Sequence, residues 1–133
     1  MLGVIPPAQI DRAWPVCEPM LAKAWIKDNL YTLEDYKKGL KEGAFQLWTW
    51  VEDNKIACCG ITCVVVYPTT KICSIPIVGG SALKMWKDAA QQVIADWAKK
   101  SGCSQMEGYA IRHGWLRVLP NWRPVWTTIR RAI

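Results

Sequence analysis

Two adjacent glycines, Gly79 and Gly80, stand between an apolar run and a helix-like pattern in the stretch SIPIVGGSALKMW. The first N–H groups of a helix have no partner inside it and carry the positive end of its dipole. A glycine turn at such a helix start lets the backbone approach a phosphate closely. The stretch therefore predicts a phosphate-binding turn, with candidate donors at Gly79, Gly80, Ser81, Ala82 and Leu83. A structural corner remains the alternative, because a Gly-Gly pair alone does not separate the two.

Pro76 interrupts the apolar run just before these glycines. Proline cannot donate a ladder hydrogen bond, so it marks a sheet edge, a bulge or a point where the strand parts from its neighbour. At such a point the backbone groups of Ile75 and Ile77 are left free to bind the amides of a ligand.

Four side chains are candidates for moving protons. Tyr109 is a candidate general acid, and Glu107 alternates with it on one face of an expected strand. His113 is either a proton shuttle or an exposed histidine at a helix start. Glu52 is either a base acting through water or a residue that flanks a hairpin turn. One histidine and no Cys-x-x-Cys pair predict that the chain holds no metal.

The C-terminal segment is basic and rich in tryptophan. Residues 1–52 hold six Lys/Arg and seven Asp/Glu, whereas residues 53–133 hold eleven and four. Three tryptophans there interleave with five arginines: Trp115, Trp122 and Trp126 with Arg112, Arg117, Arg123, Arg130 and Arg131. Such a segment suits a protein interface or single-stranded nucleic acid, and solvent-exposed arginines are the plain alternative.

The elements that must position these residues follow from hydrophobic periodicity. Helical spacing runs over 10–25, where Pro15 and Pro19 predict a kink or a break, and Thr32 caps a helix that ends at Gly43. Strands are expected at 45–52, 55–67, 71–78, 103–111 and 123–133, with helices at 83–100 and 112–119. The order predicts one α/β (α+β) domain over 1–133, with a mixed, mostly antiparallel sheet flanked by helices on both faces.

Composition narrows the class of protein further. The six cysteines are scattered, which predicts small buried thiols rather than disulfides. The longest apolar run, 56–67, is too short to cross a bilayer, and the first residues contain no signal sequence. We therefore expect a cytoplasmic protein with no membrane partner.

The order of elements, together with SIPIVGG, KIACCGITCVVVY and DWAKKSGCSQMEGYAIRHGWLRVL, resembles the GNAT superfamily of N-acetyltransferases. The resemblance implies an acetyl-CoA-dependent acyltransferase acting on an amine. It implies that acetyl-CoA binds between the fourth and fifth strands, with its pyrophosphate at the start of the long helix. The residues at the corresponding cofactor positions are Ile75, Ile77, Val78, Gly79, Gly80, Ser81, Ala82 and Leu83, with the Ile77 and Val78 amides as oxyanion donors. The helix after the fifth strand lacks the tyrosine that the family often uses as general acid, so Tyr109 and His113 are its substitutes, and Glu107 joins them because it shares a strand face with Tyr109.

The chain is also similar to small GNAT-like proteins of tailed bacteriophages. That likeness implies a second interpretation, in which the fold is kept without catalysis. The protein would then be a virion component, or would bind a host factor or nucleic acid through its Arg/Trp-rich C-terminus, and would act in the host cytoplasm or the virion.

Overall fold

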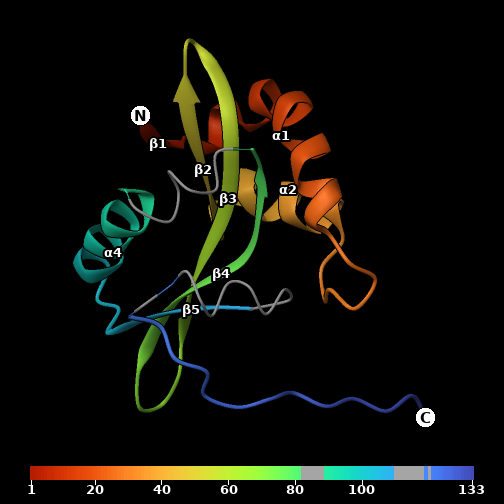
Figure 1. Cartoon of the computed structure of the whole chain (residues 1–133), viewed down its shortest axis with the longest axis vertical. Helices are drawn as coiled ribbons and strands as arrows, with labels where there is room; N and C mark the ends of the chain where they lie inside the picture. The colour runs from red at the N-terminus through yellow and green to blue at the C-terminus, as the bar shows by residue number, and fades with distance from the viewer. Residues whose placement is uncertain (82–88, 110–118, 120) are drawn as a thin grey trace.

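The computed structural model describes residues 1–81, 89–109, 119 and 121–133, and its strands form one mixed sheet (Figure 1). In sheet order the described strands are β1 (Leu2–Ile5), β2 (Phe45–Glu52), β3 (Lys55–Val66), β4 (Lys71–Gly80) and β5 (Gln105–Gly108). All neighbours pair antiparallel except β4 and β5, which pair parallel. The predicted class, a mixed and mostly antiparallel α/β sheet, is confirmed.

Helices cover both faces of this sheet (Figure 1). A short 3-10 turn, η1 (Pro7–Gln9), precedes α1 (Ile10–Ala24); α2 (Leu33–Glu42) lies on the same face as α1, and α4 (Gln91–Lys100) lies on the other. Each face has its own core, with Leu47 in the core under α1 and α2 and Trp48 in the core under α4. Consecutive strand residues point to opposite faces, so the alternating sequence of β2 serves both cores. Among the described residues, no helix is long and apolar enough to cross a membrane.

α1 is a single helix through both of its prolines. Of the two alternatives expected from the sequence, a kink or a break, the break at Pro19 is therefore wrong. Pro15 and Pro19 are four residues apart and both are exposed, whereas Trp14, Cys17 and Leu21 are buried. A proline removes one helical hydrogen bond, but on this outer face water can bind the carbonyls left free. The buried face then holds the helix together.

Three local predictions are confirmed at the ends of α2 and β2. Thr32 caps α2: its hydroxyl accepts from Asp35 N–H at 3.0 Å, and the Asp35 carboxylate accepts from Thr32 N–H at 2.8 Å. Gly43 ends the helix with φ of 82°. Asp53 and Asn54 make the β2–β3 turn with positive φ, as expected for a two-residue hairpin.

Other elements differ from the sequence prediction. β1 was not expected; it has only four residues, and its partner β2 begins 40 residues after it ends. The strand expected at 123–133 is absent, since residues 121–133 form neither strand nor helix. The expected helix at 83–100 is described only in its second half, as α4, and the expected helix at 112–119 falls almost wholly outside the described residues.

Candidate functional site

β4 carries a bulge at Pro76, the residue that the sequence singles out. Ile61 pairs with Ile77 and Cys63 pairs with Ser74, so two residues of β4 lie opposite the single residue Thr62 of β3. Bulges bend a strand and recur next to active sites. The prediction of an irregular strand at Pro76 is confirmed.

The pairing between β4 and β5 stops at the same bulge. Their described ladder runs from Ile72 opposite Gln105 to Ile75 opposite Gly108, and β4 then continues through Gly80. Within the described part of the chain, residues 77–80 therefore pair with β3 on one side only. We call the other side of this segment the β4 edge.

Two N–H groups point out of the β4 edge. In an antiparallel ladder every second residue pair exchanges two hydrogen bonds. The N-terminal amine and Val51 make one such exchange between β1 and β2, at 2.8 and 2.9 Å. The direction of the backbone N–H and C=O groups alternates from residue to residue along each strand. Followed through the register from β1 to β4, this alternation places the backbone groups of Ile77 and Gly79 toward β3. The N–H groups of Val78 and Gly80 consequently point away from β3.

The two glycines lie inside β4 and not in a turn, so the expected turn at Gly79–Gly80 is wrong. Gly79 is buried, and a Cβ there would overlap the carbonyl oxygen of Met20 in α1. Gly80 has φ of 112°, and a Cβ there would lie 2.5 Å from Cα of Cys58. Close helix–strand packing and backbone conformation therefore both require glycine here.

Only part of the predicted phosphate site falls on described residues. Ser81 donates its N–H to Ala57 O at 2.9 Å and its hydroxyl to the same oxygen at 3.1 Å, which closes the end of the β3–β4 ladder. Ala82 and Leu83 lie outside the described residues. A pyrophosphate role for Gly79–Leu83 stays a prediction, with Gly80 N–H the described donor that points outward.

A row of side chains crosses the sheet beside the bulge. Phe45 pairs with Cys63, Cys63 with Ser74, and Ser74 with Glu107, so the four residues lie side by side on β2, β3, β4 and β5. Phe45 packs against the core under α1 and α2, which identifies the face of the sheet. We call this set the polar row. It brings Glu107, a predicted site residue, next to the first residue of the bulge.

Tyr109 extends the polar row, as the alternation with Glu107 predicts. Its ring is 62% exposed. Partial burial raises the pKa of Tyr109, the Glu107 carboxylate raises it further, and a side-chain hydrogen bond with Ser74 opposes the rise. The phenol consequently stays protonated through the neutral range and can donate a proton there.

This environment gives a spectroscopic prediction. The tyrosinate absorbance lost in Tyr109→Phe should have its midpoint above the ordinary pKa of 10.0. Glu107→Gln should lower that midpoint only in part, because burial is the larger cause. Ultraviolet titration of the three proteins measures this. A midpoint at or below the ordinary value would contradict the placement of Tyr109.

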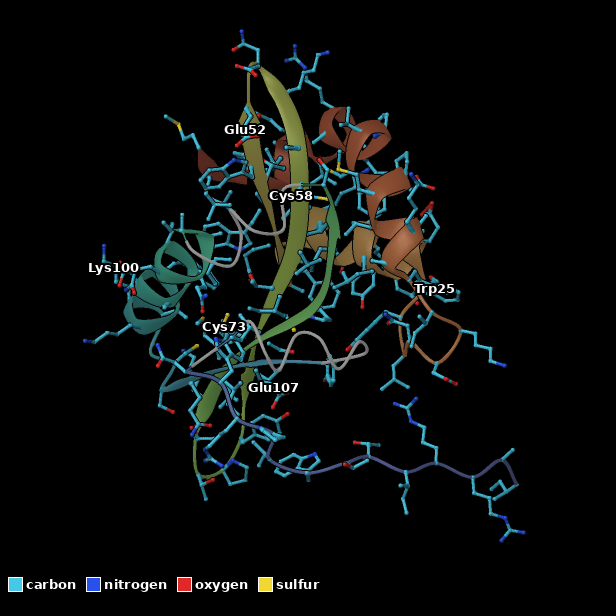
Figure 2. The ribbon with its side chains drawn as sticks, viewed as in Figure 1. Trp25, Glu52, Cys58, Cys73, Lys100 and Glu107 are labelled. Carbon is cyan, nitrogen blue, oxygen red and sulfur yellow. The ribbon has the colours of Figure 1, made fainter. Side chains whose placement is uncertain are left out.

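The remaining candidates are not brought to this place. Glu52 lies opposite Lys55 at the hairpin end of β2, and Figure 2 shows it at the opposite end of the molecule from Glu107. Its hairpin-flanking interpretation is therefore the one that fits. His113 lies outside the described residues. Among the described residues no cluster of His, Cys, Asp or Glu is suited to a metal ion.

The cysteines are free thiols, as the sequence predicts. Four of the six are buried: Cys17, Cys58, Cys59 and Cys73. Burial raises the pKa of Cys73 to about 12, so this thiol stays neutral and unreactive. In the polar row, burial likewise raises the pKa of Cys63.

Sequence reasoning missed the loop between α1 and α2, which supplies aromatic rings beside the polar row. The Tyr31 ring lies 5.4 Å from the Tyr36 ring and 5.5 Å from the Phe45 ring. Asn29 orders this loop, since its Oδ1 accepts from the Tyr36 hydroxyl at 3.0 Å and from Tyr31 N–H at 3.1 Å. Burial raises the pKa of Tyr36 to about 12. These contacts depend on loop geometry, and no motif in the sequence indicates them.

Comparison with known proteins places this arrangement in a fold. No family model and no curated protein sequence match the chain. Solved structures do match over all of it. An aminoglycoside acetyltransferase from an uncultured soil metagenomic sample has a TM-score of 0.70 at 11% identity, with 95% of that chain covered. A ribosomal-protein-alanine N-acetyltransferase from Brucella melitensis has 0.70 at 14% identity, with 99% covered.

A third similar structure is that of a protein of the GNAT family. A GNAT family acetyltransferase from Staphylococcus aureus matches the whole chain with a TM-score of 0.62 at 14% identity, and 98% of that chain is covered. Identities this low speak to the fold and not to the substrate. The chain has the fold of the GNAT family acetyltransferases.

Proposed function

We propose that the chain is an acyltransferase that takes an acetyl group from acetyl-CoA and passes it to an amine. One observation carries the proposal: beyond the bulge at Pro76 the N–H groups of Val78 and Gly80 point away from β3, on the side of β4 where β5 carries Glu107 and leads into Tyr109. Backbone donors beside an acid and a carboxylate are what acyl transfer requires. The shared fold with acetyltransferases supports this assignment.

Each group at the β4 edge has a role in this proposal. Acetyl-CoA, when bound, supplies the acetyl group as a thioester. Val78 N–H would hold the thioester oxygen, where negative charge develops during transfer. Gly80 N–H and the carbonyl of Val78 suit the amides of the pantetheine arm. Tyr109 would hold its proton ready for the departing thiolate, and Glu107 would accept the proton that the amine loses.

A thermal-shift experiment tests the proposal. Acetyl-CoA at a hundred times its dissociation constant should raise the free energy of unfolding by about 2.7 kcal/mol. ATP is the matched control, because it offers phosphates to a protein with a net charge of +6 but has no pantetheine arm. No shift with millimolar acetyl-CoA, or an equal shift with ATP, would contradict the proposal.

A second candidate function, binding of a single-stranded nucleic acid, is favoured by the C-terminal segment. Residues 123–133 are exposed throughout, Trp126 is 77% exposed, and the segment holds Arg123, Arg130 and Arg131. Arg130 Nη1 donates to Asp28 O at 2.8 Å, on the loop between α1 and α2. Aromatic stacking and arginine contacts to phosphates suit such a ligand.

Deletion of 123–133 tests this second function. The deletion should change the free energy of unfolding by less than about 1 kcal/mol, because the segment is exposed. It should abolish binding of a fluorescent single-stranded oligonucleotide and leave the response to acetyl-CoA intact. In the full chain that binding should weaken steeply with added salt. Binding that survives the deletion would place the interface elsewhere.

A further inference from the structure

All four tyrosines of the chain gather on one face of the sheet, around the polar row. Tyr31 and Tyr36 contact Phe45 at the β2 end of the row, with ring centroids 5.5 and 5.7 Å away. Tyr109 stands at the β5 end, and its electrostatic neighbours include Glu107 and Tyr67. The opposite face is lined differently, since the Trp48 and Trp97 rings meet edge to face there, with centroids 5.5 Å apart. The face under α1 and α2 thus combines phenol rings with one carboxylate.

Several of these groups are open to a ligand. Tyr31 is 42% exposed and Tyr67 is 45% exposed, while Ser74 in the polar row is buried. The loop that carries Tyr31 is held from both sides, because Trp25 Nε1 donates to Tyr31 O at 2.8 Å. A ring fixed in this way loses little conformational freedom when a ligand stacks on it. The tyrosines therefore form a pre-ordered aromatic surface with Glu107 at one end.

The charges beside the polar row favour a ligand with a single positive charge. Glu107 is the only acidic residue of the polar row, and it is the only one from Trp97 to the C-terminus. The chain carries a net charge of +6, and Arg130 is fixed to the neighbouring loop at Asp28 O. A ligand with several positive charges would have one carboxylate partner in the row and would meet repulsion from Arg130 and from the net positive charge of the chain. A monocation would pair with Glu107 without that penalty.

The length of the row indicates the rest of the ligand. Neighbouring strands are about 4.8 Å apart, so three steps separate Phe45 from Glu107 by about 14 Å. Phenol rings bind apolar and aromatic groups, and they also attract a cation that lies over their faces. A ligand with its amine at Glu107 would therefore lay an apolar body along Tyr109 and Tyr31.

We propose that the tyrosine-lined face binds the acceptor, and that the acceptor is a singly charged primary amine on an apolar or aromatic body. This inference rests on the proposed acetyl transfer, because it assigns the acceptor side of the same site. Glu107 lies opposite Ser74, just before the bulge, so an amine paired with it lies next to the point where the β4 edge begins. Polyamines and heavily hydroxylated amines are poor fits, because the row offers one carboxylate and mostly aromatic carbon.

Direct binding measurements test this inference without turnover. Calorimetry is done with 2-phenylethylamine, 2-phenylethanol and spermidine, each with and without CoA. The three ligands distinguish the contribution of the aromatic body to binding from that of the positive charge. We expect 2-phenylethylamine to bind about tenfold more tightly than 2-phenylethanol, which has the same body without the charge. Spermidine should be the weaker of the two amines. Equal binding of amine and alcohol, or tighter binding of spermidine, would overturn the inference.

Variants locate the binding on the chain. Glu107→Gln keeps the shape of the side chain and should weaken the binding of 2-phenylethylamine about tenfold. Glu52→Gln is the matched control at the other end of the sheet and should change nothing (Figure 2). Tyr31→Leu should weaken the binding of the same ligand about threefold, because the aromatic ring that stacks on it is lost. If Glu107→Gln and Glu52→Gln bind alike, the site is not the polar row.

The thermal shift with acetyl-CoA keeps the two proposals distinguishable. A normal acetyl-CoA shift without amine binding overturns the acceptor assignment alone and leaves acetyl transfer standing. An absent acetyl-CoA shift contradicts the proposed function itself. Amine binding that depends on Glu107 supports the tyrosine-lined face in either case, since calorimetry reads it directly.

Discussion

Gly79→Ala should lower the free energy of unfolding by about 2–3 kcal/mol, a large share of what a domain of this size has. The added Cβ would overlap Met20 O, a backbone atom of α1 that cannot rotate aside as a side chain can. Either α1 must lift from β4 or β4 must shift against β3, and both moves loosen the core that contains Leu21 and Ile77. Urea unfolding followed by tryptophan fluorescence measures the loss.

Gly3→Ala is the matched control for this prediction. Gly3 is also a strand glycine, but a Cβ there would meet nothing within 4 Å, and its φ is not positive. The same chemical change should therefore leave stability unchanged or raise it by less than about 1 kcal/mol. Equal losses in both variants would show that the cost is a general effect of alanine in a strand, not the contact with α1.

The contrast between Pro76 and the glycines explains which parts of the site the sequence could predict. Pro76 is informative by itself, because a missing N–H disturbs a ladder wherever it occurs. The bulge and the end of the β4–β5 ladder follow from that single property. Gly79 is ambiguous, because glycine suits a turn and a close approach equally well. Only the position of α1 over β4 decides, and that position depends on residues far away in the sequence.

The ends of the chain show the same limit. β1 has four residues and gains its order from pairing with β2, so no periodic pattern could reveal it. Residues 123–133 alternate and are rich in β-branched side chains, yet they form no strand. Propensity describes how well a segment fits a sheet, and a strand also needs a neighbour. The aromatic loop around Tyr31 belongs to the same category, because Asn29 orders it through contacts with Tyr31 and Tyr36 that no sequence motif indicates.

Replacing the Val78 amide by an ester should slow acetyl transfer about 10²–10³-fold, the usual effect of losing one oxyanion donor. The change introduces 2-hydroxyisovaleric acid at this position, so the side chain stays and only the N–H is exchanged for oxygen. The alternation across the sheet directs this N–H away from β3, so no ladder donor is lost. Release of free CoA in the presence of 2-phenylethylamine, or of any amine found to support turnover, measures the rate.

Val4 provides a control with the same side chain and an outward N–H at the other edge of the described sheet. By the same alternation, the N–H of Val4 points out of the free side of β1, at the opposite edge of the described sheet from β5. An ester there removes an outward N–H and weakens one neighbouring carbonyl, as the ester at Val78 does. Any general effect of the amide-to-ester change on the rate therefore appears equally in both proteins. The thermal shift with acetyl-CoA checks that each protein is folded. A rate that falls only with the Val78 ester assigns the oxyanion donor to the β4 edge. Equal rates would leave the bulge as a structural feature without a part in catalysis.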